Sequence, residues 1–219
     1  MTQLTLIIAN KNYSSWSLRP WLAMKQFGLN FNEIRIPLDT PETSSKIRHY
    51  SPSEKVPVLL HGNLTVWDSL AIFEYLAEEF SNLHWLPEDK APRTVARSII
   101  AEMHSGFQSL RQNMSMNCRA RFPGKGMTPE VQKDIDRITA IWRECRQNFG
   151  TGGDMLFGKF TIADAMYAPV VSRFVTYGVQ LDAVCKKYAE AVFALPAMQE
   201  WLNAASNEQE TISSYELIV

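Results

Sequence analysis

Hydrophobic and polar positions in the first forty residues follow the pattern of a strand, a helix and a second strand. Leu4, Leu6 and Ile8 recur at every second position, which predicts a mostly buried strand. The polar loop NKNYSSWS follows, and LRPWL then places apolar residues at helical spacing. Pro20 is expected near the first turn of this helix, because a proline deeper inside removes a backbone hydrogen bond. FNEIRI predicts the second strand, so the chain opens with a βαβ unit.

The next forty residues predict two further strands and a third helix. After the short polar helix or loop PETSSKIRHYSP, the segments KVPVLL and LTVW predict a hairpin joined by the turn HGN. Pro57 cannot donate a ladder hydrogen bond, so it is expected to begin the first of these strands. The helix DSLAIFEYLAEEF follows, with Ser69 as the expected N-cap and Phe73 and Leu76 on the buried face.

The rest of the chain carries helical periodicity only. NLHWLPEDKAP interrupts the pattern and predicts a linker. Helices are expected at residues 93–117, 128–149, 161–177, 182–193 and 196–205. The predicted fold class is α/β plus all-α, with a βαβαββα domain at 1–82, a linker at 83–92 and an all-helical domain at 93–219.

One helix start in the second half has a recognisable capping pattern. Thr161 and Asp164 stand three residues apart, as the N-cap and N3 residues of a capping box do. Phe160 precedes them as a possible hydrophobic staple. We assign this motif to folding and not to chemistry.

Composition excludes several classes of protein. The 219 residues carry a formal net charge of -1, which offers no basic excess for nucleic acid. The N-terminal apolar run is too short for a membrane span and lacks a basic region, so a cytoplasmic protein without membrane attachment is expected. The three cysteines are widely spaced and the four histidines lack metal-ligand spacing, so neither a disulfide framework nor a metal is expected.

Four short motifs occur in order along the chain: SSWSLR, KVPVL, WDSLAI and FTIADAMYAP. On these motifs the whole chain resembles the cytosolic glutathione transferases, and the first three are most similar to those of zeta- and tau-class members. The resemblance implies a thioredoxin-like N-terminal domain, a helical C-terminal domain, a homodimer, and glutathione as cosubstrate.

The resemblance also implies a set of glutathione contacts in the first domain. A cis bond before Pro57 would turn the Val56 backbone outward to pair with the extended peptide. Asp68 would pair with the γ-glutamyl ammonium, Ser69 would hold the neighbouring carboxylate at a helix N-terminus, and Lys55 would reach the glycyl carboxylate. The structural alternatives are a trans proline beginning an edge strand, a plain helix cap, and a solvated lysine.

The motif SSWSLR carries the expected chemistry. A free thiol has a pKa of about 8.5, so a hydroxyl that donates to the sulfur is needed to favour thiolate at neutral pH. By resemblance Ser14 takes this role, with Ser15 and Ser17 as close rivals and Tyr13 as a weaker one. A capping role for Ser14 or Ser15 is compatible with it. Trp16 stands where zeta members carry cysteine, which weakens the case for maleylacetoacetate isomerase and places an indole near the sulfur.

The electrophile site is expected between the domains. His104, Phe107 and Arg111 recur on the expected 93–117 helix, and Arg173 is a further candidate. The alternative is that these side chains are core or solvated.

The predicted function is attack of the glutathione thiolate on a small, apolar electrophile. The alternatives are a glutathione-dependent isomerase or lyase and a non-catalytic glutathione-binding protein of the same fold. An omega-type thiol reductase is disfavoured, because the SSWSLR loop has no cysteine.

Overall fold

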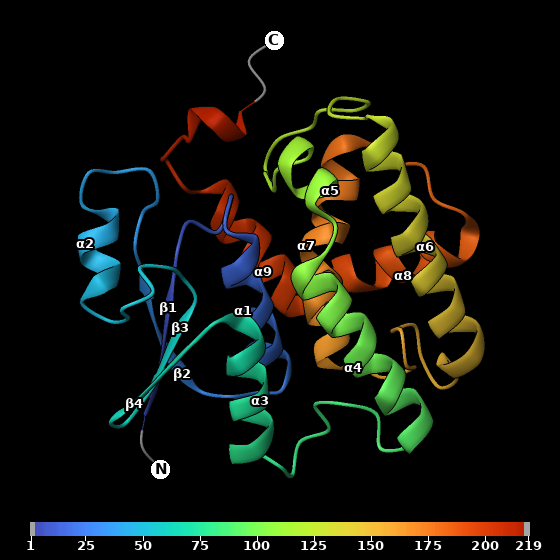
Figure 1. The fold of residues 1–219 in the computed structure, drawn as a ribbon, viewed down its shortest axis with the longest axis horizontal. Helices are drawn as coiled ribbons and strands as arrows, with labels where there is room; N and C mark the ends of the chain where they lie inside the picture. The colour runs from blue at the N-terminus through green and yellow to red at the C-terminus, as the bar shows by residue number, and fades with distance from the viewer. Residues whose placement is uncertain (1–2, 217–219) are drawn as a thin grey trace.

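The computed structural model describes residues 3–216, which form a small mixed sheet with helices on both faces and a larger group of helices beside it (Figure 1). The strands are β1 (Leu4–Ile8), β2 (Phe31–Arg35), β3 (Val58–His61) and β4 (Leu64–Trp67), in the spatial order β2-β1-β3-β4. β1 runs parallel to β2, whereas β3 is antiparallel to both of its neighbours.

Alternation along β1 sends its side chains to two different cores. Leu6 and Ile8 join the main core with helices α1 (Ser15–Gln26) and α3 (Ser69–Glu79), while Ile7 faces a smaller cluster under α2 (Thr43–Arg48). The predicted order βαβαββα is confirmed.

The remaining helices form the second half of the molecule. They are α4 (Lys90–Ser105), α5 (Gln108–Asn113), α6 (Pro129–Phe149), α7 (Ile162–Tyr177), α8 (Ala183–Phe193) and α9 (Pro196–Ser206), followed by a 3₁₀ turn at Ser213–Tyr215. α7 lies at the centre of this group and packs against α1, α4 and α8. The fold class is therefore a thioredoxin-like sheet with a helical second part, as predicted.

The boundary between the two domains remains a prediction. α3 ends at Glu79 and α4 begins at Lys90, on either side of the expected 83–92 linker. The outer ends of the predicted domains, residues 1–2 and 217–219, lie outside the described residues.

Two expectations for the helices are wrong. The 93–117 helix is interrupted at Gly106 and Phe107, and Phe107 adopts a left-handed backbone at φ 60°. Because Met103, Phe107, Leu110 and Met114 are all buried across the break, their spacing resembles one continuous helical stripe. In α1 the helix begins at Ser15, which puts Pro20 in the second turn instead of the first.

The predicted capping box at α7 is confirmed. The Thr161 hydroxyl caps the first turn, and Asp164 Oδ2 accepts from the Thr161 N–H at 2.8 Å. Asp164 Oδ1 accepts from the Leu156 N–H at 3.0 Å, which ties the preceding loop to the helix start. Burial raises the pKa of the Asp164 carboxyl to about 6, against the opposing effect of these donors.

Candidate functional site: a cavity between the sheet and the helices

A cavity of about 540 Å³ lies where the sheet meets the second group of helices. Three loops of the first half form one wall: the start of α1, the segment before β3, and the start of α3. Arg111 on α5 and Arg173 on α7 enter from the other side. The lining residues are Tyr13, Ser14, Ser15, Trp16, Leu38, Thr43, Ile47, Ser53, Glu54, Lys55, Val56, Pro57, Trp67, Asp68, Ser69, Arg111, Ser115, Met116, Arg173 and Tyr215.

The segment before β3 offers an unpaired piece of backbone. The Val56–Pro57 peptide bond is cis, as the family resemblance implies. Val56 lies two residues before the start of β3 at Val58, and none of the backbone hydrogen bonds between residues 3–216 uses its N–H or its carbonyl. An extended peptide in the cavity can therefore pair with Val56 in the manner of an added strand.

The start of α3 differs from the expectation by one residue. Asp68, not Ser69, is the N-cap: its backbone has a φ of 74°, and its carboxylate accepts from the Leu70 N–H at 2.8 Å. Ser69 is the first helical residue. The residue is 1% exposed, and its buried hydroxyl has no hydrogen-bond partner among the described residues. A helix N-terminus with an unsatisfied hydroxyl is suited to bind a carboxylate.

The start of α1 presents two serine hydroxyls to the cavity. Ser14 is the N-cap, with its Oγ accepting from the Ser17 N–H at 3.3 Å and donating to Ser17 Oγ at 2.8 Å. Ser17 Oγ in turn accepts from the Ala9 N–H at 3.1 Å, behind the cavity wall. Ser15 is the first helical residue and lines the cavity.

The Tyr13 hydroxyl is held by other groups. It donates to Glu216 Oε1 at 2.6 Å and accepts from Arg119 Nη2 at 2.9 Å. Burial and the hydrogen bond to Glu216 raise the pKa of Tyr13. This hydroxyl is therefore less suited than Ser14 or Ser15 to donate to a sulfur atom.

Trp16 lies beside two arginines and a histidine. The Arg19 guanidinium lies 4.1 Å from its ring centroid, the Arg111 guanidinium 4.9 Å, and the His104 ring meets it edge-on at 5.4 Å. Arg19 is completely buried, and none of its three guanidinium nitrogens has a hydrogen-bond partner within residues 3–216. Burial lowers the pKa of Arg19, and the nearby charges of Arg111 and Arg173 lower it further.

Arg173 adds a third guanidinium. Its Nε donates to the Met114 carbonyl at 2.8 Å and its Nη1 to the Pro169 carbonyl at 3.3 Å. Burial lowers its pKa to about 10, with a contribution from Arg111. Three clustered cations repel one another and favour the binding of an anion between them.

The structure brings ten of the twelve predicted site residues to the cavity wall. The other two are His104, which lies behind the wall with Nε2 3.4 Å from Asp68 Oδ2, and Phe107, which packs into the main core. Burial lowers the pKa of His104.

Sequence reasoning missed wall residues such as Leu38, Met116 and Tyr215. They come from connecting segments without a local motif, so only the folded chain could reveal them.

Comparison with known proteins agrees with this architecture. The chain matches the model of the glutathione S-transferase N-terminal domain over residues 13–79 and that of the C-terminal domain over residues 128–204. It is 33% identical to glutathione S-transferase 1 of Dianthus caryophyllus over 74% of this chain and 73% of that protein. It is 29% identical to maleylacetoacetate isomerase of Rattus norvegicus over 84% and 85% of the two chains.

A solved structure has the same fold. A glutathione transferase homologue from Burkholderia GL BGR1, crystallised with bound glutathione, superposes with a TM-score of 0.71 at 24% identity, covering 94% of this chain and 100% of that one. The chain belongs to the glutathione S-transferase family.

Residues 3–216 contain neither a candidate membrane span nor a candidate metal site. No helix there has the length and apolarity needed to cross a bilayer. Nor do three or more acidic, histidine or cysteine side chains gather in this part of the chain as they would around a metal ion.

Proposed function

We propose that this protein binds glutathione in the 540 Å³ cavity and activates its thiol for attack on a small electrophile. One juxtaposition carries the proposal. The unpartnered Ser69 hydroxyl at the start of α3 and the unpaired Val56 backbone share a cavity with Ser14 and Ser15 at the start of α1. A peptide held at Val56 and Ser69 can extend its cysteinyl thiol toward those serines.

The polar groups match glutathione from end to end. The γ-glutamyl carboxylate meets Ser69 and the α3 N-terminus, and its ammonium meets the Asp68 carboxylate. The cysteinyl unit pairs with the backbone of Val56. Lys55, on the cavity wall, reaches the glycyl carboxylate.

The thiolate is stabilised by a hydroxyl at the start of α1. A hydrogen bond to a charged group contributes about 1.5–3 kcal/mol, or roughly one to two pKa units. Ser14 provides this bond when its hydroxyl turns from Ser17 Oγ toward the sulfur. The helix N-terminus adds a favourable field for the anion.

The arginines favour an anionic electrophile over the apolar one expected from the sequence. Arg111 and Arg173 line the cavity, and Arg19 adds positive charge behind Trp16. A carboxylate on the electrophile would relieve the repulsion among these groups.

A second reaction type is supported by the relatives. The protein from Rattus norvegicus is named an isomerase, and in an isomerisation the thiolate adds to the substrate and later leaves. In conjugation the thioether stays and glutathione is consumed. The same site supports both reactions, because each begins with the thiolate as nucleophile.

Three measurements test binding, thiol ionisation and the preferred charge of the substrate. Calorimetry measures glutathione affinity, and ultraviolet absorbance measures the bound thiolate. Product analysis uses pairs of electrophiles that differ only in carrying a free carboxylate or its methyl ester, and it determines whether glutathione is consumed. We expect binding, a thiol pKa below the free value, and a higher kcat/KM for the acids.

A matched pair of variants tests the arginine argument. Arg111→Gln should reduce the preference for acids, whereas Arg97→Gln, on the exposed face of α4, should leave it unchanged. Binding without turnover of any electrophile would instead support a non-catalytic glutathione-binding protein.

A further inference from the structure

The loop between β1 and α1 is buried and polar, and distant parts of the chain hold it in place. Asn10, Lys11 and Asn12 are all buried. The Asn10 carbonyl accepts from the N–H groups of Tyr13 at 3.2 Å and Ser14 at 2.8 Å, which closes a tight turn just before the first helical residue. The position of this turn therefore sets the position of Ser14.

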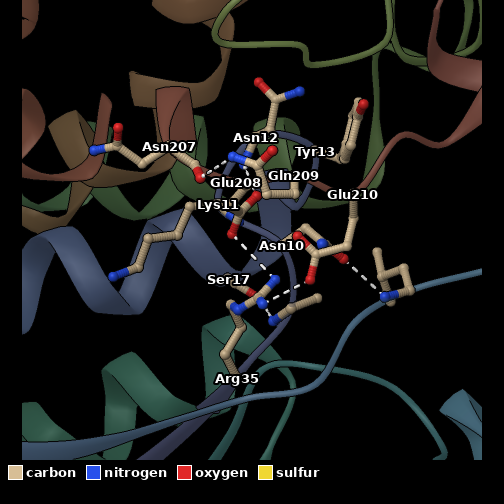
Figure 2. A network of polar contacts seen from close by, with 12 residues as sticks. Asn10, Lys11, Asn12, Tyr13, Ser17, Arg35, Asn207, Glu208, Gln209 and Glu210 are labelled. Atoms are coloured by element: carbon tan, nitrogen blue, oxygen red, sulfur yellow. Dashed lines mark hydrogen bonds and ion pairs between the residues drawn. The ribbon is translucent and has the colours of Figure 1, made fainter. Parts of the chain in front are cut away.

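Glu208 holds the tip of this turn. It lies just beyond the end of α9, and its two carboxylate oxygens accept from the N–H groups of Lys11 at 2.7 Å and Asn12 at 3.0 Å (Figure 2). Only 7% of the Glu208 side chain is exposed. Hydrogen bonds from backbone amides to an ionised carboxylate are stronger than those between neutral groups, and two of them fix direction as well as distance.

Glu208 is in turn anchored from both halves of the molecule. Arg35 at the end of β2 places Nη1 3.5 Å from Glu208 Oε1. Arg119, from the segment between α5 and α6, donates from Nη1 to the Glu208 carbonyl at 2.7 Å. The carboxylate is therefore held against the turn.

Other contacts fix the remaining groups of the turn. The Trp201 indole donates to the Lys11 carbonyl at 2.8 Å, and the Asn12 side chain donates to Asn117 Oδ1 at 3.0 Å. These bonds use the carbonyl and the side chain, so within residues 3–216 Glu208 is the only acceptor for the two backbone N–H groups. Removing one of its acceptor oxygens leaves a buried donor without a partner, which the turn relieves by shifting.

We propose that Glu208 is a positioning residue for the thiolate site, and this rests on the proposed function. Its carboxylate holds the Lys11–Asn12 backbone and thereby sets where the hydroxyls of Ser14 and Ser15 stand relative to the bound thiol. Glu208 contacts neither glutathione nor the electrophile. It acts through the turn.

The test compares Glu208→Gln with Glu210→Gln in the full chain. Glutamine keeps the shape of Glu208 but replaces one acceptor oxygen with an amide that faces a backbone N–H. Glu210 is the matched control: it lies two residues away, and its carboxylate accepts from Arg35 Nη2 at 2.6 Å without touching the amides of Lys11 and Asn12. Hydrogen exchange of residues 9–16, the pKa of bound glutathione thiol, and glutathione affinity are measured for each.

Glu208→Gln should speed exchange in residues 9–16, raise the bound thiol pKa by roughly half a unit to one unit, and lower kcat at neutral pH, with glutathione affinity changed by about twofold at most. Glu210→Gln should match the wild type in all of these. Should Glu208→Gln fail to fold, Glu208→Asp serves instead, because it keeps the charge but withdraws the carboxylate by one methylene.

Three results would overturn the proposal. Faster exchange with an unchanged thiol pKa shows that Glu208 contributes to folding only. Unchanged exchange shows that it does not hold the turn. If the wild type itself binds no glutathione or forms no thiolate, the proposed function fails first, and the positioning role fails with it.

Discussion

At the scale of single residues, both serines at the start of α1 line the cavity, but only Ser14 also caps the helix. Ser14 serves the helix, because its Oγ accepts from the Ser17 N–H and donates to Ser17 Oγ. Ser15 lines the cavity at the first helical position. Since the two serines are neighbours, the sequence alone leaves the choice between them open.

Ser14→Ala should raise the pKa of the bound glutathione thiol by roughly one to two units, reflecting the loss of about 1.5–3 kcal/mol from a charge-assisted hydrogen bond. Turnover at neutral pH should fall and partly recover at higher pH, because more thiol ionises there. A spectroscopic titration of thiolate absorbance measures this.

Ser15→Ala and Ser17→Ala are the comparison variants. A shift only in Ser15→Ala would move the role one residue along α1. If none of the three variants shifts the pKa, the backbone N–H groups and the helix dipole stabilise the thiolate without a hydroxyl.

Asp68→Asn should weaken glutathione binding by about 1.5–3 kcal/mol, because it removes the negative charge that faces the γ-glutamyl ammonium while keeping a side chain able to cap α3. Isothermal calorimetry measures the change. Asp182→Asn is the control, since Asp182 caps α8 and does not line the cavity. Equal affinities for Asp68→Asn and the wild type would contradict the assignment.

At the scale of elements, the capping pattern predicted one helix start correctly and missed another by one residue. The capping box at Thr161 and Asp164 forms as its spacing predicts. At α3 the cap moves from Ser69 to Asp68, because a carboxylate one residue earlier reaches the Leu70 N–H. That shift matters for function, since it leaves the Ser69 hydroxyl unpartnered in the cavity.

Thr161→Ala should lower the free energy of unfolding by about 1 kcal/mol, the usual effect of losing a helix cap. Urea unfolding measures this, and calorimetry should show unchanged glutathione affinity because Thr161 lies outside the cavity wall. Thr128→Ala, which removes the cap of α6, is the matched comparison for stability. Lost affinity in a folded Thr161→Ala protein would refute a purely structural role.

At the scale of the whole molecule, β4 forms one edge of the sheet and leaves apolar side chains uncovered. Leu64 and Trp67 are 54% and 45% exposed. An exposed apolar edge strand is a surface on which another chain can pack. Together with family membership, this supports the homodimer implied by the resemblance.

Light scattering should therefore give about 50 kDa, twice the 25.0 kDa of one chain. Leu64→Glu should shift the protein toward the monomer, because it places a charge on the proposed interface. Met127→Glu, at an exposed apolar residue between α5 and α6, should not. A mass of 25 kDa across a wide concentration range would count against the dimer.

The sequence by itself determined the order of strands and helices, the cap at Thr161, and the motifs that identify the family. These features depend on residues close together in the chain, where periodicity and capping preferences act. The sequence did not predict the break at Gly106 and Phe107, because the buried residues on both sides of the break keep a helical spacing. Only the tertiary structure decided that Arg19 and Arg111 lie beside Trp16, that Arg173 lines the same cavity, and that Glu208 reaches the turn before Ser14. Those contacts join residues up to 197 positions apart in the sequence, and no local sequence pattern predicts contacts at that separation.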